Sequence, residues 1–169
     1  MRARRQHAIT FIVGAALTVA GAGCGDSSSS SAPPTTPDGK RATLGVADHD
    51  LGAMLVDSQG RTLYVFAKDS GPESTCTGAC LTQWPRVTVK GKPAVGIGAN
   101  ASLVGSERQA NGAAQLIYKG HPLYLYAGDA SPGDENGQNI NAYGGIWRAV
   151  APSGDVITAA APSGNPSGY

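Results

Sequence analysis

The chain has 169 residues and a formal net charge of +1, with 13 basic and 12 acidic residues. Three of the basic residues lie among the first five positions, which leaves ten against twelve acidic ones, a net charge near −2, in the rest of the chain. No basic stripe indicates a nucleic-acid partner, and no segment after residue 23 is long and apolar enough to cross a membrane.

The first 23 residues have the features of a secretory signal peptide. Arg2, Arg4 and Arg5 form a cationic start, and a mainly apolar stretch runs from Ala8 to Ala20. A membrane-spanning helix needs about 20 apolar residues, so this stretch is too short for one, whereas its length and flanks are typical of an export signal. The sequence therefore predicts an exported protein.

A cysteine follows this stretch. The small residues Gly21, Ala22 and Gly23 precede Cys24, and the arrangement resembles a bacterial lipobox, although leucine is more usual where Gly21 stands. In a lipobox the cysteine is lipidated and becomes the first mature residue. We therefore expect Cys24 to anchor the protein at the outer face of the cell membrane. The alternative is an ordinary cleaved signal followed by an incidental cysteine.

Residues 24–39 are expected to form a disordered tether. From Asp26 to Gly39 the sequence reads DSSSSSAPPTTPDG, with no apolar residue larger than alanine or proline. Such a segment cannot bury enough surface to offset the entropy cost of ordering it. The tail at 161–169, which contains Pro and Gly, is expected to be frayed.

Between the tether and the tail, the hydrophobic pattern predicts strands, arranged as repeat 1 (40–90), an inter-repeat loop (91–113) and repeat 2 (114–160). Each repeat is predicted to contain a β-hairpin followed by a further strand. The predicted strands are Leu51–Val56, Thr62–Ala67, Arg86–Val89, Ala114–Tyr118, Leu123–Ala127, Ile146–Val150 and Val156–Thr158, with an additional edge strand at Thr43–Ala47 and one short helical turn at Ala101–Val104.

An internal repeat supports this division. The segment Gly60–Asp69 returns as Gly120–Asp129 at an offset of sixty residues, with the shared pattern G-x-x-L-Y-x-aromatic-A-x-D. Self-similarity of this kind indicates duplication of one small unit. The predicted fold class is therefore all-β, with two hairpin-plus-strand units packed as a pseudo-symmetric sandwich or small barrel.

Six aromatic residues occupy matched positions in the two repeats, namely Tyr64, Phe66, Trp84, Tyr124, Tyr126 and Trp147. Alternate residues of a strand face opposite ways, so Tyr64 and Phe66 share one face while Leu63 and Val65 share the other. Because both faces are apolar, we expect these strands to be covered on both sides and the aromatic rings to form a paired core. The alternative is an aromatic groove that holds a hydrophobic or glycan ligand.

Cys76 and Cys80 are close together in the sequence C-T-G-A-C. In an exported protein such a pair is expected to form a disulfide that shapes its loop. The alternative is a redox or soft-metal site, completed through folding by His49, His121 or Met54. For His121 a solvated turn position is the preferred interpretation.

Asp69 and Asp129 end matching strands and are expected to bond the backbone of their own turns, with ligand binding as the alternative. The polar stretch Asp129–Asn141 could offer oxygen atoms to calcium, but it lacks EF-hand spacing, so a surface loop is preferred.

The motifs L-V-D-x-x-G-R-T-L-Y-x-F, S-T-C-T-G-A-C followed by W-P, and G-H-P-L-Y-x-Y-A-G-D together resemble a bacterial family of secreted-repeat lipoproteins. That family is defined by a tandem Tyr-x-aromatic-x-x-Asp motif and has no assigned function. The resemblance covers roughly residues 43–158 and implies a lipid-anchored extracytoplasmic β-rich domain.

The sequence contains no recognisable catalytic motif. It lacks a G-x-S-x-G elbow, an H-E-x-x-H helix, a phosphate-binding glycine loop and a haem-attachment motif. We therefore predict a non-enzymatic binding or structural lipoprotein that needs no cofactor and whose protein or small-molecule ligand is unknown. The second hypothesis is an extracytoplasmic redox or metal-handling accessory that uses Cys76 and Cys80.

Overall fold

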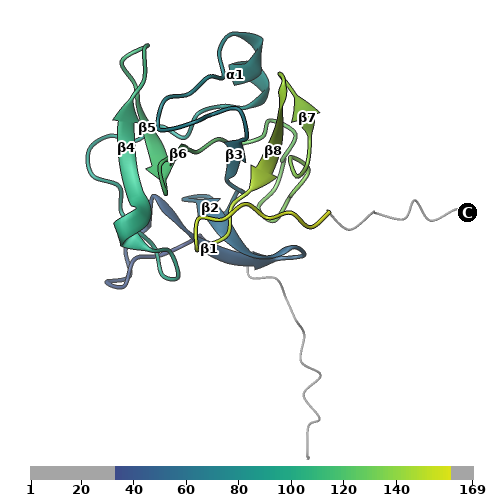
Figure 1. Ribbon diagram of the computed structural model, residues 1–169. Coiled ribbons are helices and arrows are strands. Elements are labelled where there is room, and N and C mark those ends of the chain that lie inside the picture. Colours follow the sequence, from purple (N-terminus) through teal and green to yellow (C-terminus); the bar gives the residue numbers. More distant parts are fainter. Residues whose placement is uncertain (1–32, 161–169) are drawn as a thin grey trace, which may run out of the picture.

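The computed structural model describes residues 33–160, which form three small antiparallel sheets and no closed barrel (Figure 1). The sheets have the strand orders β1-β2, β3-β8-β7 and β4-β5-β6. The elements are β1 (Leu44–His49), β2 (Gly52–Asp57), β3 (Tyr64–Phe66), α1 (Ala79–Gln83), the 3₁₀ helix η1 (Ala101–Leu103), β4 (Val104–Arg108), β5 (Ala114–Tyr118), β6 (His121–Pro122), β7 (Asn141–Ala142) and β8 (Gly145–Ala149). The all-β prediction is confirmed.

The predicted signal peptide, residues 24–32 of the tether, which include Cys24, and the tail lie outside the described residues. The rest of the predicted tether, residues 33–39, is ordered against the domain, because the Pro34 carbonyl accepts from the Ala42 N–H at 3.0 Å and the Thr35 carbonyl accepts from the Ile97 N–H at 2.8 Å. Within 33–160, neither helix is long and apolar enough to cross a membrane.

In repeat 1, the main hairpin differs from the predicted one. β2 pairs along its whole length with β1, from Leu44 opposite Asp57 to His49 opposite Gly52. Its backbone pairing with the following segment is limited to a single bridge between Val56 and Thr62 and a few hydrogen bonds. The strand at Thr43–Ala47, expected only as an edge addition, is therefore the principal partner of β2.

The turn after β2 forms as predicted because an aspartate closes it. The Asp57 carboxylate accepts hydrogen bonds from the backbone N–H groups of Gln59 at 2.8 Å and Arg61 at 3.0 Å, and it also pairs with the Arg61 guanidinium at 2.6 Å. An aspartate that bonds the backbone two residues later is the usual way in which this residue stabilises a turn.

Repeat 2 has the same architecture, including a strand that the sequence analysis missed. β5 turns through Lys119 and Gly120, both at positive φ (48° and 82°), into β6. Positive φ at both central residues is characteristic of a type I′ hairpin turn. On its other edge β5 pairs with β4, which lies in the segment 91–113 that was predicted to be a loop. The short helical turn predicted nearby is present as η1.

The two repeats exchange their closing segments: the segment at the end of each repeat pairs with the motif strand of the other repeat. In the β3–β8 pair, Tyr64 of repeat 1 lies opposite Ala149 of repeat 2. In the equivalent pair, Tyr124 of repeat 2 lies opposite Arg86 of repeat 1. Tyr64 and Tyr124 themselves exchange two backbone hydrogen bonds of 2.9 Å, so equivalent residues meet where a local two-fold axis would pass.

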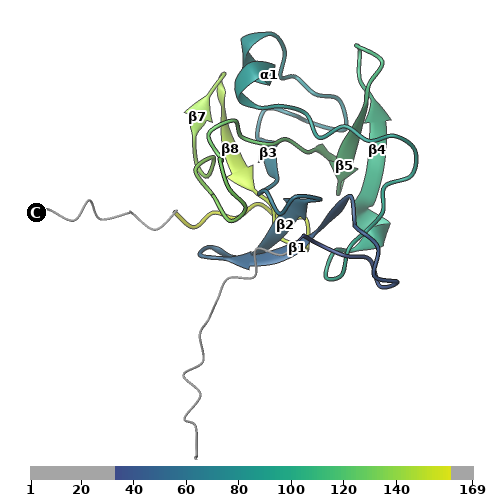
Figure 2. The same ribbon diagram turned by 180° about the vertical axis from the view of Figure 1, so that it is seen from behind.

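β3 separates two hydrophobic clusters. Leu63 and Val65 belong to a mainly aliphatic cluster with residues of β1, β2 and β5. Tyr64 and Phe66 belong to an aromatic cluster that also contains both tryptophans. The predicted alternation, with both faces covered, is therefore confirmed. Figures 1 and 2 both place α1 at the end of the molecule opposite the β1–β2 hairpin.

Candidate functional site

The aromatic residues of the repeat motif form a core. Five of the six are buried and Tyr126 is half-buried. The Trp84 and Trp147 rings stack 3.9 Å apart and within 4° of parallel, and Phe66 continues the stack 4.1 Å from Trp147. Tyr64 meets Trp84 edge-on at 5.6 Å, and Tyr124 meets Trp147 edge-on at 5.1 Å. Since the rings are packed against one another, they do not line an open groove.

The motif tyrosines bond the motif aspartates of the opposite repeat. The Tyr64 hydroxyl donates to Asp129 Oδ2 at 2.7 Å, and the Tyr124 hydroxyl donates to Asp69 Oδ2 at 2.6 Å. Each Tyr-x-aromatic-x-x-Asp motif is therefore completed by the other copy.

The second carboxylate oxygen of each aspartate fixes the loop that follows it. Asp69 Oδ1 accepts from the Thr75 backbone N–H at 2.8 Å and from the Thr75 hydroxyl at 2.6 Å. Asp129 Oδ1 accepts from the Asn136 backbone N–H at 3.0 Å. The predicted turn-bonding role is present, and the contact to the other repeat's tyrosine is an addition that the sequence analysis missed.

Burial sets the protonation of these groups. It raises the pKa of both Tyr64 and Tyr124 well above the ordinary value, so the two phenols are neutral and act as hydrogen-bond donors. Burial also raises the pKa of Asp129, while the Tyr64 hydrogen bond opposes that rise. Gly137 packs against this pair, because a Cβ there would lie only 2.7 Å from Tyr64 Cζ.

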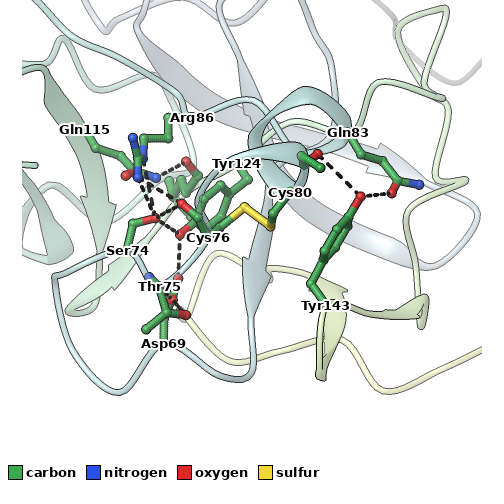
Figure 3. The surroundings of a disulfide bond; sticks show 12 residues. Asp69, Ser74, Thr75, Cys76, Cys80, Gln83, Arg86, Gln115, Tyr124 and Tyr143 are labelled. Carbon is green, nitrogen blue, oxygen red and sulfur yellow. Dashed lines mark hydrogen bonds between the residues drawn. A yellow bond between two sulfur atoms is a disulfide. The ribbon is translucent and has the colours of Figure 1, made fainter. Parts of the chain in front are cut away.

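Cys76 and Cys80 form the predicted disulfide, with both residues buried against the aromatic cluster. Cys80 lies in α1, a short helix that the sequence analysis assigned to a loop. The Arg86 guanidinium donates to the Cys76 carbonyl at 3.0 Å, and Ser74 Oγ lies 2.8 Å from the Tyr124 hydroxyl (Figure 3). The bridge therefore supports the loop that contacts the second repeat's motif.

The described residues provide little for a metal ion. Within 33–160 no group of three or more His, Cys, Asp or Glu side chains is arranged to hold one. His121 is exposed, in agreement with the preferred solvated position, and the two cysteine sulfurs are bonded to each other. In the Asp129–Asn141 stretch, Asp134 Oδ2 accepts from the backbone N–H groups of Ala130 and Ser131.

A buried histidine–glutamate contact was not predicted. His49 Nδ1 lies 3.6 Å from Glu135 Oε1, with the two side chains only 5% and 8% exposed. Burial lowers the pKa of His49 and raises that of Glu135, so the imidazole is neutral at neutral pH and the contact is not an ion pair there. The pair joins the β1–β2 hairpin of repeat 1 to a loop of repeat 2. Its partners are 86 positions apart, so no local sequence signal could have indicated it.

The pockets that the described residues form on the outside of the domain include two small ones. One, of about 220 Å³, is mainly apolar and is lined by Val65, Ala67, Ile146, Arg148 and Val156. The other, of about 290 Å³, lies beside the start of β1 and contains three basic side chains.

Comparison with known proteins gives one result. A family model described as a secreted repeat of unknown function matches the chain twice, at residues 45–88 and 106–151. No curated protein and no solved structure matches the chain. The two matches correspond to the two structural repeats, and the second begins within β4. Together they cover more than half of the sequence. The chain therefore belongs to this family of secreted repeats, and it is an exported, all-β repeat protein.

Proposed function

We propose that this protein is a lipoprotein anchored at the outer face of the cell membrane, and that its domain is a rigid, non-enzymatic module that binds through its outer surface. The observation that carries the proposal is that the side chains of the repeat motif contact one another inside the domain. Its tyrosines, aspartates and tryptophans bond or pack against one another across the two repeats. The motif therefore serves to build the domain, which leaves the exterior for recognition.

The anchor is inferred from the N-terminal sequence together with the family. A secreted repeat that begins with an export signal and a cysteine has a means of attachment at Cys24. Acyl chains on that residue would each contribute about 0.8 kcal/mol per buried CH₂, which is enough for stable anchoring when several chains are present.

Cell fractionation tests the anchor. In cells that express the full chain, we expect the wild type to remain in the membrane fraction after a high-salt wash and to need detergent for release. The Cys24→Ser variant should be released into the medium or accumulate as an unprocessed precursor. A processed Cys24→Ser protein, without the signal peptide, that still needs detergent for release would contradict the lipoprotein proposal.

The redox or metal alternative has weaker support, because the cysteine pair is bonded and buried. It can be tested on the purified mature chain by alkylation with mass analysis and by metal content after exposure to copper, iron and haem. We expect blocked thiols and no stoichiometric metal. Two freely alkylated cysteines or a tightly bound metal would favour the accessory role.

A further inference from the structure

Among residues 33–160, three basic side chains without acidic partners surround the larger of the two pockets described above. Arg41, Lys90 and Lys92 line this pocket, which we call the basic pocket, and all three are exposed. Within residues 33–160, none of them takes part in an ion pair. The hydroxyl-bearing residues Thr43 and Thr88 also line it. Ammonium, guanidinium and hydroxyl groups around a concave surface are the donors that bind phosphate oxygens.

The walls of the basic pocket are fixed by backbone contacts. The Thr43 N–H donates to the Ala94 carbonyl at 2.7 Å, and the Ala94 N–H donates back to Thr43 Oγ1 at 2.9 Å. On the other side, Arg41 Nη1 donates to the Ser58 carbonyl at 3.3 Å. The Thr43–Ala94 contacts join the start of β1 to the loop that carries the lysines, and the Arg41–Ser58 bond joins it to the turn after β2. A preformed site has less entropy to lose on binding than a mobile one.

The position of the basic pocket relates it to the membrane. Arg41 follows Cys24 by 17 residues, a length of chain that spans at most about 60 Å when fully extended. The chain meets the domain shortly before Arg41, because the Ala42 N–H donates to the Pro34 carbonyl at 3.0 Å and the Ile97 N–H donates to the Thr35 carbonyl at 2.8 Å. If Cys24 is anchored as proposed, the basic pocket, which contains Arg41, therefore lies next to the segment by which the tether joins the domain.

Charge is distributed unevenly along β1. The basic pocket lies at its beginning, whereas Asp48 and Asp50 flank the other end, where Glu135 lies against the hairpin turn. Six residues of a strand separate these ends by about 20 Å. An anionic surface would attract the first end and repel the second, although the chain after the signal has a net charge near −2.

We propose that the basic pocket binds the phosphate group of anionic phospholipids and so orients the anchored domain on the membrane. The proposal deepens the proposed function, and it rests on the lipid anchor for its setting in the cell. Binding at the pocket itself does not require the anchor, so the two can fail separately.

Vesicle flotation with the unlipidated mature chain, carrying Cys24→Ser, measures membrane binding by the pocket in the absence of the lipid anchor. The probes are vesicles of phosphatidylcholine alone and vesicles that also contain phosphatidylglycerol. We expect binding only to the anionic vesicles, with an affinity that falls as salt is raised. Lys90→Gln with Lys92→Gln should weaken binding by about fivefold for each lysine removed.

A charge-matched control distinguishes binding at the basic pocket from general electrostatic attraction to the vesicle. Lys68→Gln with Arg108→Gln removes the same charge from exposed positions outside the basic pocket and should leave vesicle binding nearly unchanged. Equal loss in both double variants, or equal binding to neutral and anionic vesicles, would overturn the proposal. A further test is a titration with inorganic phosphate that is monitored by NMR. Saturable binding of free phosphate at Lys90 and Lys92 without vesicle binding would overturn the lipid as the source of the phosphate.

Discussion

At the residue scale, each motif aspartate has two structural roles. One carboxylate oxygen closes a loop of its own repeat, and the other accepts a phenol from the opposite repeat. Asp69 is 4% exposed, whereas Asp129 is more accessible. Loss of a hydrogen-bond partner costs more at a buried acceptor, because water cannot replace the partner there.

We therefore expect Tyr124→Phe to destabilise the domain by about 1–3 kcal/mol, and Tyr64→Phe to cost less. Urea unfolding at pH 7 measures both, and Tyr143→Phe serves as the control because the Tyr143 hydroxyl donates to Gln83 Oε1 at an exposed position, where water can replace it. Tyr64→Phe should also raise the pKa of Asp129 further, since it removes a bond to the ionised carboxylate. An unchanged Asp129 titration by NMR would argue against the observed bond.

The buried His49 predicts a pH dependence. Burial lowers its pKa below the ordinary 6.5, so the native state binds fewer protons than the unfolded state in the range just below that value. His49 therefore lowers stability as pH falls from about 7 toward 5, with a slope of at most about 1.4 kcal/mol per pH unit. Glu135 and Asp129 have raised pKa values, so their protonation acts in the opposite direction at lower pH.

Comparison of the wild type with His49→Gln isolates this contribution. The variant should lose less stability between pH 7 and pH 5.5 than the wild type, as measured by urea midpoints. His121→Gln is the matched control, because His121 is exposed. If the two variants have the same pH profile, His49 is not responsible for the dependence.

At the element scale, the disulfide and α1 form one local unit. The bridge closes a ring of five residues, for which chain entropy gives about 2 kcal/mol. Both cysteines are buried, so an attacking thiolate has little access to the sulfurs in the folded state. The helix has no side-chain N-cap and contains only five residues, so it depends on the bridge and on packing.

We expect Cys76→Ala with Cys80→Ala to increase hydrogen exchange in α1 and at Trp84, while the β3–β8 pairing remains protected. In the wild type, mild reductant should leave the bridge intact unless urea is present. Rapid reduction of the native protein would contradict a purely structural bridge and would revive the redox hypothesis. Global unfolding of the double variant would instead make the bridge essential to the whole domain.

The elements that were predicted correctly are those with a local signal. The alternation of side-chain directions around Tyr64 indicated which residues lie on each face of β3. Turn-forming residues indicated the bends at Asp57 and Lys119. β4 was missed because its residues are largely polar and half-exposed. A signal for it existed at the same sixty-residue offset, since Leu44-Gly45 of β1 corresponds to Val104-Gly105 of β4. The partners of the strands had no local signal, because a period-two pattern identifies a face and not a neighbour.

At the scale of the whole molecule, the exchange of closing segments makes the two repeats one folding unit. β3 of repeat 1 pairs with β8 of repeat 2, and Tyr124 of repeat 2 forms a bridge with Arg86 of repeat 1. The Trp84–Trp147 stack also takes one ring from each repeat. A single repeat would therefore expose half of the aromatic cluster and leave its motif aspartate without a tyrosine. Chain length alone points the same way, because domains of this size bury too little surface to be cut in half.

This arrangement predicts that neither repeat folds as a monomer. Residues 24–98 and 99–169, expressed separately, should each give the circular dichroism and poor NMR dispersion of an unfolded chain. Mixing the two fragments should restore native spectra, since every exchanged strand then finds its partner. Equivalent residues meet at Tyr64 and Tyr124, so a single fragment at high concentration could satisfy its bonds only by pairing with a second copy. A folded monomeric fragment would show that the exchange of segments is not what holds the domain together.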